Sequence, residues 1–253
     1  MRARVTAITT LAVIGLLISG CQGDDNASEQ ERLTVLAASS LTESFTTIGQ
    51  QFETDNPGVE VSISFGSSST LATQVVDGAA ADVIATASPG SIEPVVDAEM
   101  TAADPTVFAT NSVAVALPAD NPAGIQDLAD LQGSDVKVAV CVDTAPCGSV
   151  AADMFEAADL SITPVTEEVD VKSVLAKVVA GEVDAGVVYA SDVLAAGDDV
   201  TSVQIPSSAV VTTDYLIAQL TSSSNSALAN EFVDAVTSAD GQQVLTEAGF
   251  NAP

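Results

Sequence analysis

The chain contains no histidine and no tryptophan, and it has only six lysine and arginine residues among 253. Without histidine, neither a Ser-His-Asp nor a Cys-His arrangement can activate a nucleophile, and most histidine-based metal sites are excluded. A hydrolase that pairs serine with lysine stays formally possible, because Lys137, Lys172 and Lys177 are present. The composition argues against an enzyme, and we expect neither catalysis nor a cofactor.

Positive charge is scarcest in the part that follows the first twenty residues. All 35 acidic residues come after Cys21, whereas Arg2 and Arg4 come before it. Without the first twenty residues, four basic residues face 35 acidic ones, a formal charge of −31. Such a chain is a poor partner for nucleic acid or for anionic lipid. The acids are spread along the sequence, which is more typical of a solvated surface than of an acidic binding site.

The N-terminus has the pattern of a secretory signal. Arg2 and Arg4 precede the apolar run Leu11–Ile18, and Ser19-Gly20-Cys21 follows it. This run is shorter than the ~20 apolar residues that span a bilayer. Ile18-Ser19-Gly20-Cys21 fits a lipoprotein cleavage box better than an uncleaved anchor. We therefore expect a signal peptide at 1–20, acylation of Cys21 and a polar, flexible tether at 21–32. The protein would lie outside the cytoplasm and be anchored to the membrane by its lipid alone.

Two further cysteines remain once Cys21 is acylated. Cys141 and Cys147 form an even pair in an oxidising compartment, which favours a disulfide. The chain-entropy model makes so small a loop worth roughly 2 kcal/mol. Two cysteines without histidine make a poor zinc site.

From Leu33 onward, short apolar runs alternate with helical periodicity, which predicts an α/β fold with mainly parallel sheets. Ser40-Leu-Thr-Glu43 has the spacing of a helix capping box, and Asp170 is a second candidate cap. A helix is also expected over 125–131. Both a single doubly wound domain and two lobes fit this pattern.

Several predicted strands run directly into helix starts marked by small residues, and Tyr189 ends another strand. The four junctions are Ser39-Ser40, Ser67-Ser68-Ser69, Cys147-Gly148-Ser149 and Asp170-Val171. Open α/β sheets bind ligands at the carboxyl ends of their strands, where helix N-termini favour anions. Any single serine is more simply explained as a helix cap. Several such junctions together favour an anion site.

No basic residue lies in these four junctions. Serine and tyrosine hydroxyls and backbone N–H groups can all donate to a fully ionised tetrahedral anion. A phosphate that keeps a proton would need an acceptor facing it, and only Asp170, which we interpret as a cap, offers one. The donor set therefore favours anions such as sulfate or molybdate over phosphate.

The ordered set of motifs resembles the periplasmic molybdate-binding proteins of ABC transporters over residues 33 to 253. The segments that carry this resemblance are Leu33-Thr-Val-Leu-Ala-Ala-Ser-Ser-Leu41, Phe65-Gly-Ser-Ser-Ser-Thr-Leu71, Gly78-Ala-Ala-Ala-Asp82, Glu168-Val-Asp-Val-Lys172, Gly186-Val-Val-Tyr-Ala-Ser-Asp192 and Ala248-Gly-Phe250.

The resemblance implies a two-lobed periplasmic-binding-protein fold with two crossover hinge strands and a ligand cleft between the lobes. Lobe 1 would hold 33–112 and 208–253, and lobe 2 would hold 113–207. By motif position, five residues would bind molybdate or tungstate: Ser40 and Ser68 through their hydroxyls, Cys147 and Val171 through backbone N–H groups, and Tyr189 through its hydroxyl. Many relatives have alanine where Cys147 stands, and a backbone donor needs no particular side chain.

The resemblance also implies that the protein is a monomer that delivers its anion to the permease of an ABC importer. Three alternatives stay open: a binding protein for another tetrahedral anion such as sulfate, a lipid-anchored serine hydrolase, and a structural or adhesive surface protein. The lack of histidine weighs against the hydrolase, and the lack of internal repeats weighs against the structural protein.

Overall fold

A computed structural model describes residues 31–253. The expected signal peptide, Cys21 and residues 21–30 of the expected tether lie outside the described residues. The first strand begins at Glu31, two residues earlier than the sequence suggested, and Arg32 forms an ion pair with Glu60 at 3.0 Å. No helix within 31–253 has the length and apolarity needed to cross a membrane.

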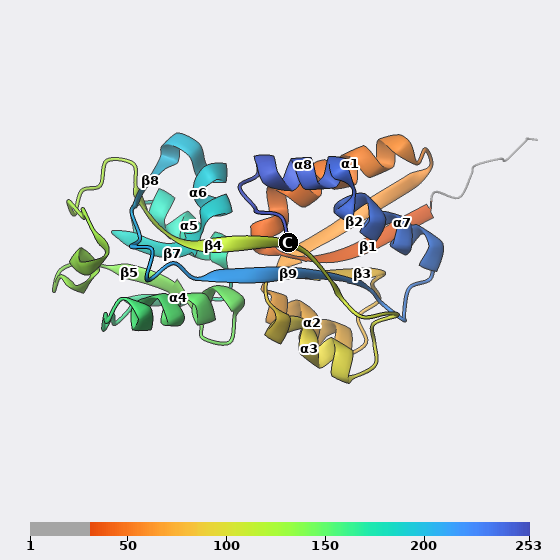
Figure 1. Cartoon of the computed structure of the whole chain (residues 1–253), viewed down its shortest axis with the longest axis horizontal. Coiled ribbons are helices and arrows are strands. Elements are labelled where there is room, and N and C mark those ends of the chain that lie inside the picture. Colours follow the sequence, from red (N-terminus) through yellow and green to blue (C-terminus); the bar gives the residue numbers. More distant parts are fainter. Residues whose placement is uncertain (1–30) are drawn as a thin grey trace, which may run out of the picture.

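The structure has two lobes, which lie side by side along its long axis (Figure 1). Lobe 1 contains the buried phenylalanine side chains and Tyr215, and it has a second apolar cluster on the other face of its sheet. Lobe 2 is built around a core of valine, alanine and leucine side chains. The sequence pattern predicted an α/β fold, and the family resemblance implied the two lobes. The division at residues 112 and 208 stays a prediction.

Lobe 1 is a sheet with the strand order β2-β1-β3-β9-β4. Helices α1, α7 and α8 cover one face and α2 and α3 cover the other (Figure 1). The elements are β1 (Glu31–Ala38), η1 (Ser39–Leu41), α1 (Thr42–Asp55), β2 (Val59–Gly66), α2 (Ser68–Val76), β3 (Val83–Thr86), α3 (Pro89–Asp97), β9 (Thr212–Gln219), α7 (Ser226–Thr237) and α8 (Ala239–Glu247), together with the first half of β4 (Thr106–Pro118).

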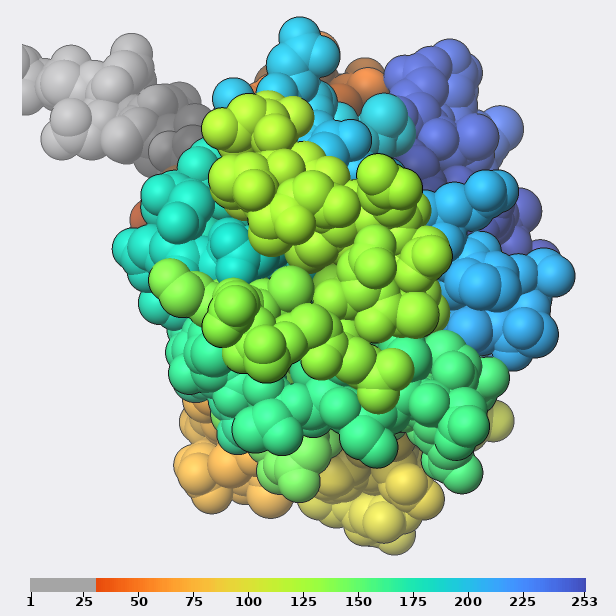
Figure 2. Space-filling view, turned by 90° about the vertical axis from the view of Figure 1, so that its left-hand side faces the viewer, coloured from red at the N-terminus to blue at the C-terminus, as the bar shows by residue number. Residues whose placement is uncertain are grey.

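Lobe 2 continues the sheet from the second half of β4, in the order β4-β7-β5-β6, with β8 also paired to β4. Figure 2 looks at this end of the molecule, where lobe 2 faces the viewer and α2 and α3 of lobe 1, orange to yellow, project below it. The elements are η2 (Leu128–Gln132), β5 (Val138–Cys141), α4 (Pro146–Ala157), β6 (Thr166–Glu168), α5 (Val171–Val179), β7 (Ala185–Tyr189), α6 (Ala190–Ala196), η3 (Gly197–Asp199) and β8 (Val200–Val203).

The strands β4 and β9 join the two lobes. Residues 106–112 of β4 pair with β9, and residues 113–118 pair with β7 and β8. The expectation of mainly parallel sheets is met only at β1, β2 and β3 and at β5, β6 and β7. Every ladder that contains β4 or β9 is antiparallel, because these two strands run back and forth between the lobes.

Two local predictions were wrong. Ser40 does not cap a helix: it lies in η1, α1 begins at Thr42, and no side chain caps that helix start. The hydroxyl of Ser40 bonds Tyr215 instead, so a tertiary partner replaces the local one. The helix expected over 125–131 is only the short η2, which Asp127 caps by accepting from Ala129 and Asp130 N–H.

Candidate anion-binding site

All five residues predicted to bind the ligand line one cavity between the lobes. Its walls are Ala38, Ser39, Ser40, Gly66, Ser67, Ser68, Ala87, Pro146, Cys147, Asp170, Val171 and Tyr189. The cavity volume is about 10 Å³, which leaves room for roughly one water-sized centre. The space between the lobes is therefore smaller than a tetrahedral anion in this structure.

Lobe 1 contributes side-chain hydroxyls to the cavity. Ser68 lies at the start of α2, where its Oγ accepts from the backbone N–H of Ala87 at 3.0 Å. Because a backbone N–H can only donate, the proton of Ser68 stays available for a ligand. Ser40 Oγ lies 2.7 Å from the hydroxyl oxygen of Tyr215. Both serines are almost fully buried, at 2% and 3% exposure.

Neighbouring serines are arranged differently. Ser39 also lines the cavity, whereas Ser69 does not. The Ser69 hydroxyl donates to the backbone oxygen of Thr144 at 2.6 Å, a bond that runs from lobe 1 to lobe 2. Ser69 therefore acts as a contact between the lobes, whereas Ser67 and Ser68 of this junction line the cavity.

Lobe 2 places two helix starts against the cavity. Val171 is the first residue of α5, and Cys147 is the second residue of α4 after Pro146. The first four N–H groups of a helix have no partner inside the helix, so these backbones can donate to an anion. Asp170 begins α5 by accepting from the N–H of Ser173 at 2.9 Å. This is the capping role that the sequence predicted for it.

The loop before α4 is tightly folded. Cys141 and Cys147 are joined by a disulfide in the structure. A Cβ on Gly148 would lie 2.0 Å from the backbone oxygen of Val142, so only glycine fits there. The backbone N–H of Ala145 donates to the Val142 oxygen at 3.0 Å, and that of Gly148 donates to the Ala145 oxygen at 2.9 Å. Close packing and hydrogen bonds thus hold the Cys147 backbone beside the cavity, in addition to the disulfide.

Tyr189 ends β7 with its ring almost fully buried, at 1% exposure. Its hydroxyl has no hydrogen-bond partner among residues 31–253. Burial raises the pKa of Tyr189 well above its usual value, and the nearby Tyr215 and the charge of Asp192 add to that rise. The phenol therefore keeps its proton. A buried donor without a partner is costly, and a ligand oxygen in the cavity would satisfy it.

No lysine or arginine lines the cavity, and Asp170 is the one acidic residue in its wall. The nearest cation along the chain is Lys172, which follows Val171. Its Nζ lies 2.8 Å from Glu43 and 3.2 Å from the buried Asp192. Two carboxylates thus surround this ammonium, which leaves little positive field for an anion.

The ion pair between Lys172 and Asp192 is not a directed hydrogen bond, because Asp192 Oδ1 has no hydrogen-bond partner in the described part of the chain. Burial raises the pKa of Asp192 to about 6, although the charge of Lys172 and the N–H of Tyr189 oppose the rise. Glu43 belongs to lobe 1 and Lys172 to lobe 2, so this cluster also bridges the lobes.

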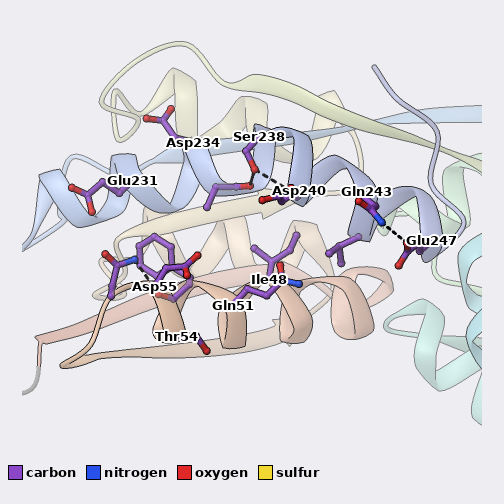
Figure 3. A pocket seen from close by; sticks show the side chains of 15 residues that line it. Ile48, Gln51, Thr54, Asp55, Glu231, Asp234, Ser238, Asp240, Gln243 and Glu247 are labelled. Carbon is purple, nitrogen blue, oxygen red and sulfur yellow. Dashed lines mark hydrogen bonds between the residues drawn. The ribbon is translucent and has the colours of Figure 1, made fainter.

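A larger groove of about 740 Å³ lies on the surface of lobe 1, between α1 and the helices α7 and α8 (Figure 3). No lysine or arginine lines this groove. Its labelled side chains include the five carboxylates of Asp55, Glu231, Asp234, Asp240 and Glu247. Such a groove repels anions. Within 31–253, no three His, Cys, Asp or Glu side chains gather to hold a metal ion. The small cavity between the lobes is the better candidate.

The sequence did not reveal the residues behind the donors. The Tyr215 hydroxyl contacts Ser40 Oγ, and the backbone N–H of Ala87 donates to Ser68 Oγ. Nothing in the sequence around Tyr215 or Ala87 indicated these contacts. Tyr215 is a strand residue 175 positions from Ser40. The pair Glu43–Lys172 spans 129 positions. Lys172 belongs to the segment Glu168–Lys172 that carries the family resemblance, but its pairing with Glu43 was not predicted.

A family model described as bacterial extracellular solute-binding protein matches residues 33–251. The molybdate-binding protein ModA of Mycobacterium tuberculosis is 40% identical, covering 99% of this chain and 100% of that protein. ModA of Escherichia coli K12 is 28% identical over 93% of this chain and 95% of that protein.

Among solved structures, the periplasmic molybdate-binding protein of Azotobacter vinelandii has a TM-score of 0.78 at 19% identity, covering 87% of this chain and 99% of that one. The sulfate-binding protein SubI of Mycobacterium tuberculosis has a TM-score of 0.79 at 18% identity, covering 88% and 87%. At these identities the two structures show the shared fold alone.

Proposed function

The chain belongs to the bacterial extracellular solute-binding proteins, and from this premise we propose that it binds molybdate, and also tungstate, outside the cytoplasm and delivers the anion to an ABC importer. The full-length relatedness to molybdate-binding proteins of two genera supports this choice of ligand. The predicted family is confirmed. The permease partner follows from the proposed function.

One observation carries the choice of site: neutral donors from both lobes converge on a single buried cavity. Ser40 and Ser68 supply hydroxyls, Cys147 and Val171 supply helix-start N–H groups, and Tyr189 supplies an O–H that has no protein partner among the described residues. Each can donate to a doubly charged tetrahedral anion, and charge-assisted bonds of this kind are strong. We propose these five residues as the ligand-binding set.

Selectivity follows from the donors. A fully ionised anion needs only donors, whereas a protonated phosphate needs an acceptor for its own proton. Asp170, the acid in the cavity wall, already accepts from the N–H of Ser173. Molybdate and tungstate share shape and charge, so both suit the same set. Because lobe 1 and lobe 2 each hold part of it, the ligand stabilises the closed arrangement.

The attachment of the protein is part of the same proposal. Cleavage after residue 20 and acylation of Cys21 would tether the binding domain to the outer face of the membrane. One binding cavity lined by residues of a single chain requires no second copy, so we propose a monomer. The formal charge of −31 after the leader keeps the domain away from anionic surfaces.

Sulfate is the second candidate within the binding class, because the same neutral donors suit it and SubI has the same fold. Its low identity makes that support weak. Calorimetric titration of the purified protein with molybdate, tungstate, sulfate and phosphate distinguishes these ligands. We expect tight binding of the first two. Binding of sulfate alone would assign the site to sulfate, and no heat with any anion would refute the proposed class.

We propose that the protein has no catalytic role. Ser134 stands three residues before Lys137, a spacing that some serine–lysine hydrolases use, but both residues are exposed and neither lines the cavity between the lobes. An ester and phosphoester activity screen tests this point, and hydrolysis that Ser134→Ala abolishes would overturn it.

Tyr189→Phe tests the site itself. The change removes one hydroxyl from a ring that is packed at 6.1 Å from the ring of Tyr215. One hydrogen bond to a charged group is worth about 1.5–3 kcal/mol, so we expect a loss of roughly tenfold or more in molybdate affinity. The melting temperature of the ligand-free protein should not fall. Unchanged affinity would remove Tyr189 from the site.

A further inference from the structure

Tyr215 is a buried polar residue that the ligand-binding set does not include. It lies in β9 of lobe 1 with 0% of its surface exposed, and it does not line the cavity. Its ring packs edge-on against Phe108, Tyr189 and Phe250, with centroids 5.2 to 6.2 Å away. Its hydroxyl oxygen lies 2.7 Å from Ser40 Oγ. From this distance alone, either oxygen could be the donor.

The direction of this bond follows from where the Tyr215 proton can go. Burial raises the pKa of Tyr215, so the phenol stays protonated, and the nearby polar side chains of Ser40 and Asn111 offset only part of the rise. Asn111 Nδ2 carries protons of its own, one of which goes to Ser191 Oγ at 2.8 Å. If Ser40 donated to Tyr215, the tyrosine proton would be left without an acceptor in a fully buried environment. An unmade bond of this kind is expensive.

We propose that Tyr215 is a positioning residue that donates to Ser40 Oγ and thereby aims the Ser40 proton into the cavity. Ser68 provides the precedent within the same lobe, because the N–H of Ala87 must donate to Ser68 Oγ. The same arrangement would then occur twice in lobe 1. In each case a donor from the interior of the lobe donates to the serine Oγ, so that the serine hydroxyl is left to donate its own proton to the ligand. The inference rests on the proposed function of the cavity.

The test is a double-mutant cycle on molybdate affinity, measured by calorimetry. Tyr215→Phe keeps the ring and removes the hydroxyl, and we expect about a threefold to tenfold loss of affinity. In a Ser40→Ala protein, the same change should alter affinity less than about twofold, because its target is gone. In a Ser68→Ala protein it should keep its full effect, because Ala87, not Tyr215, serves Ser68.

These outcomes separate the possible failures. If the unaltered protein does not bind molybdate, the proposed function fails. If it binds and Tyr215→Phe costs the same with and without Ser40, or costs nothing, the positioning role is wrong. Circular dichroism and the melting temperature of each ligand-free variant check that it is folded.

A second measurement leaves Tyr215 unchanged, in case its variant does not fold. The chain has two tyrosines, so in protein labelled with ¹³C-tyrosine the Tyr189→Phe variant assigns the hydroxyl proton of Tyr215 by NMR. We expect a slowly exchanging hydroxyl resonance that shifts and exchanges faster in Ser40→Ala. A resonance that Ser40→Ala leaves unchanged would overturn the proposal.

Discussion

The two lobes line the same cavity, but they differ in their core side chains and in the groups that face the cavity. Lobe 1 holds six of the seven phenylalanines of the chain, and buried rings such as Phe45, Phe108 and Phe232 form its centre. Lobe 2 holds only Phe155, half-buried, and Tyr189; its core is mainly valine, alanine and leucine, with the disulfide beside the cavity. In the proposed site, lobe 1 offers side-chain hydroxyls, whereas lobe 2 offers backbone N–H groups and one phenol.

This difference teaches where each lobe tolerates change. A hydroxyl donor is lost with its side chain, whereas a backbone donor survives any substitution that keeps the helix start in place. Large rings leave large cavities when they are truncated, whereas valines leave small ones. We therefore expect lobe 1 to be sensitive to side-chain identity and lobe 2 to be sensitive to loop geometry. The predictions below test this contrast, beginning with the largest effect.

Phe232→Ala should destabilise the protein by about 3–5 kcal/mol, because the ring is 0% exposed and packs 5.4 Å from Phe52 and 6.1 Å from Phe45. Phe155→Ala in lobe 2 is the matched control, and its half-buried ring should cost well under half as much. Urea unfolding measures both. Equal losses of unfolding free energy in the two variants would show that the cores of the two lobes do not differ in their sensitivity to truncation.

Ser68→Ala should weaken molybdate binding by about 1.5–3 kcal/mol, the value of a bond to a charged acceptor. Val171→Ala in lobe 2 should change affinity by less than about threefold, since the backbone N–H remains. Calorimetry on the two variants compares a side-chain donor with a backbone donor. A larger loss for Val171→Ala would contradict the assignment of its backbone as the donor.

The border between the lobes should respond to pH through Asp192. Its pKa is raised to about 6, so between about pH 4 and 6 the folded state holds a proton that the unfolded state releases. The free energy of unfolding should therefore fall as pH rises through this window, on the order of 2 kcal/mol. Asp192→Asn should flatten this slope. Glu43 and Lys172 share the cluster, and an unchanged slope would show that Asp192 is not its source.

Replacing both Cys141 and Cys147 by alanine should lower the free energy of unfolding by roughly 2 kcal/mol. Affinity should change by less than about threefold, because Gly148 and the hydrogen bonds of Ala145 still fold the loop. The control is wild-type protein with its disulfide reduced, which should show the same loss of unfolding free energy and the same small change in affinity as the double variant. Native protein with two alkylatable thiols would show that the bridge does not form.

The smallest effect concerns salt. A dianion approaches a chain with a formal charge of −29, or −31 without its first twenty residues, and no lysine or arginine lines the cavity. Raising ionic strength shortens the Debye length from about 30 Å at 0.01 M to about 10 Å at 0.1 M. The association rate for molybdate should rise with salt while the dissociation rate barely changes. Stopped-flow titration measures both. A falling association rate would indicate a local positive field and would contradict a site made of neutral donors beside the paired Lys172.

Local sequence signals predicted most strands, most helices and the junctions that line the cavity. Tyr189 ends an apolar run, Ser68 follows an alternating strand pattern after Gly66 and Ser67, and both residues line the cavity. The same signals failed where a distant partner decides the outcome. Ser40 carries a capping-box pattern, but its hydroxyl bonds Tyr215, far along the chain. The antiparallel ladders of β4 and β9 were missed because strand periodicity does not encode direction.

The position of β9 has a consequence for the order in which the molecule can assemble. This strand lies between β3 and β4 in the sheet of lobe 1, yet residues 212–219 are among the last to be synthesised. The strands of lobe 2 all end by residue 203. As the chain emerges from its N-terminus, lobe 2 can complete its pairing while lobe 1 still lacks an interior strand. Lobe 1, whose synthesis begins first, can therefore complete its sheet only after the strands of lobe 2 have been made.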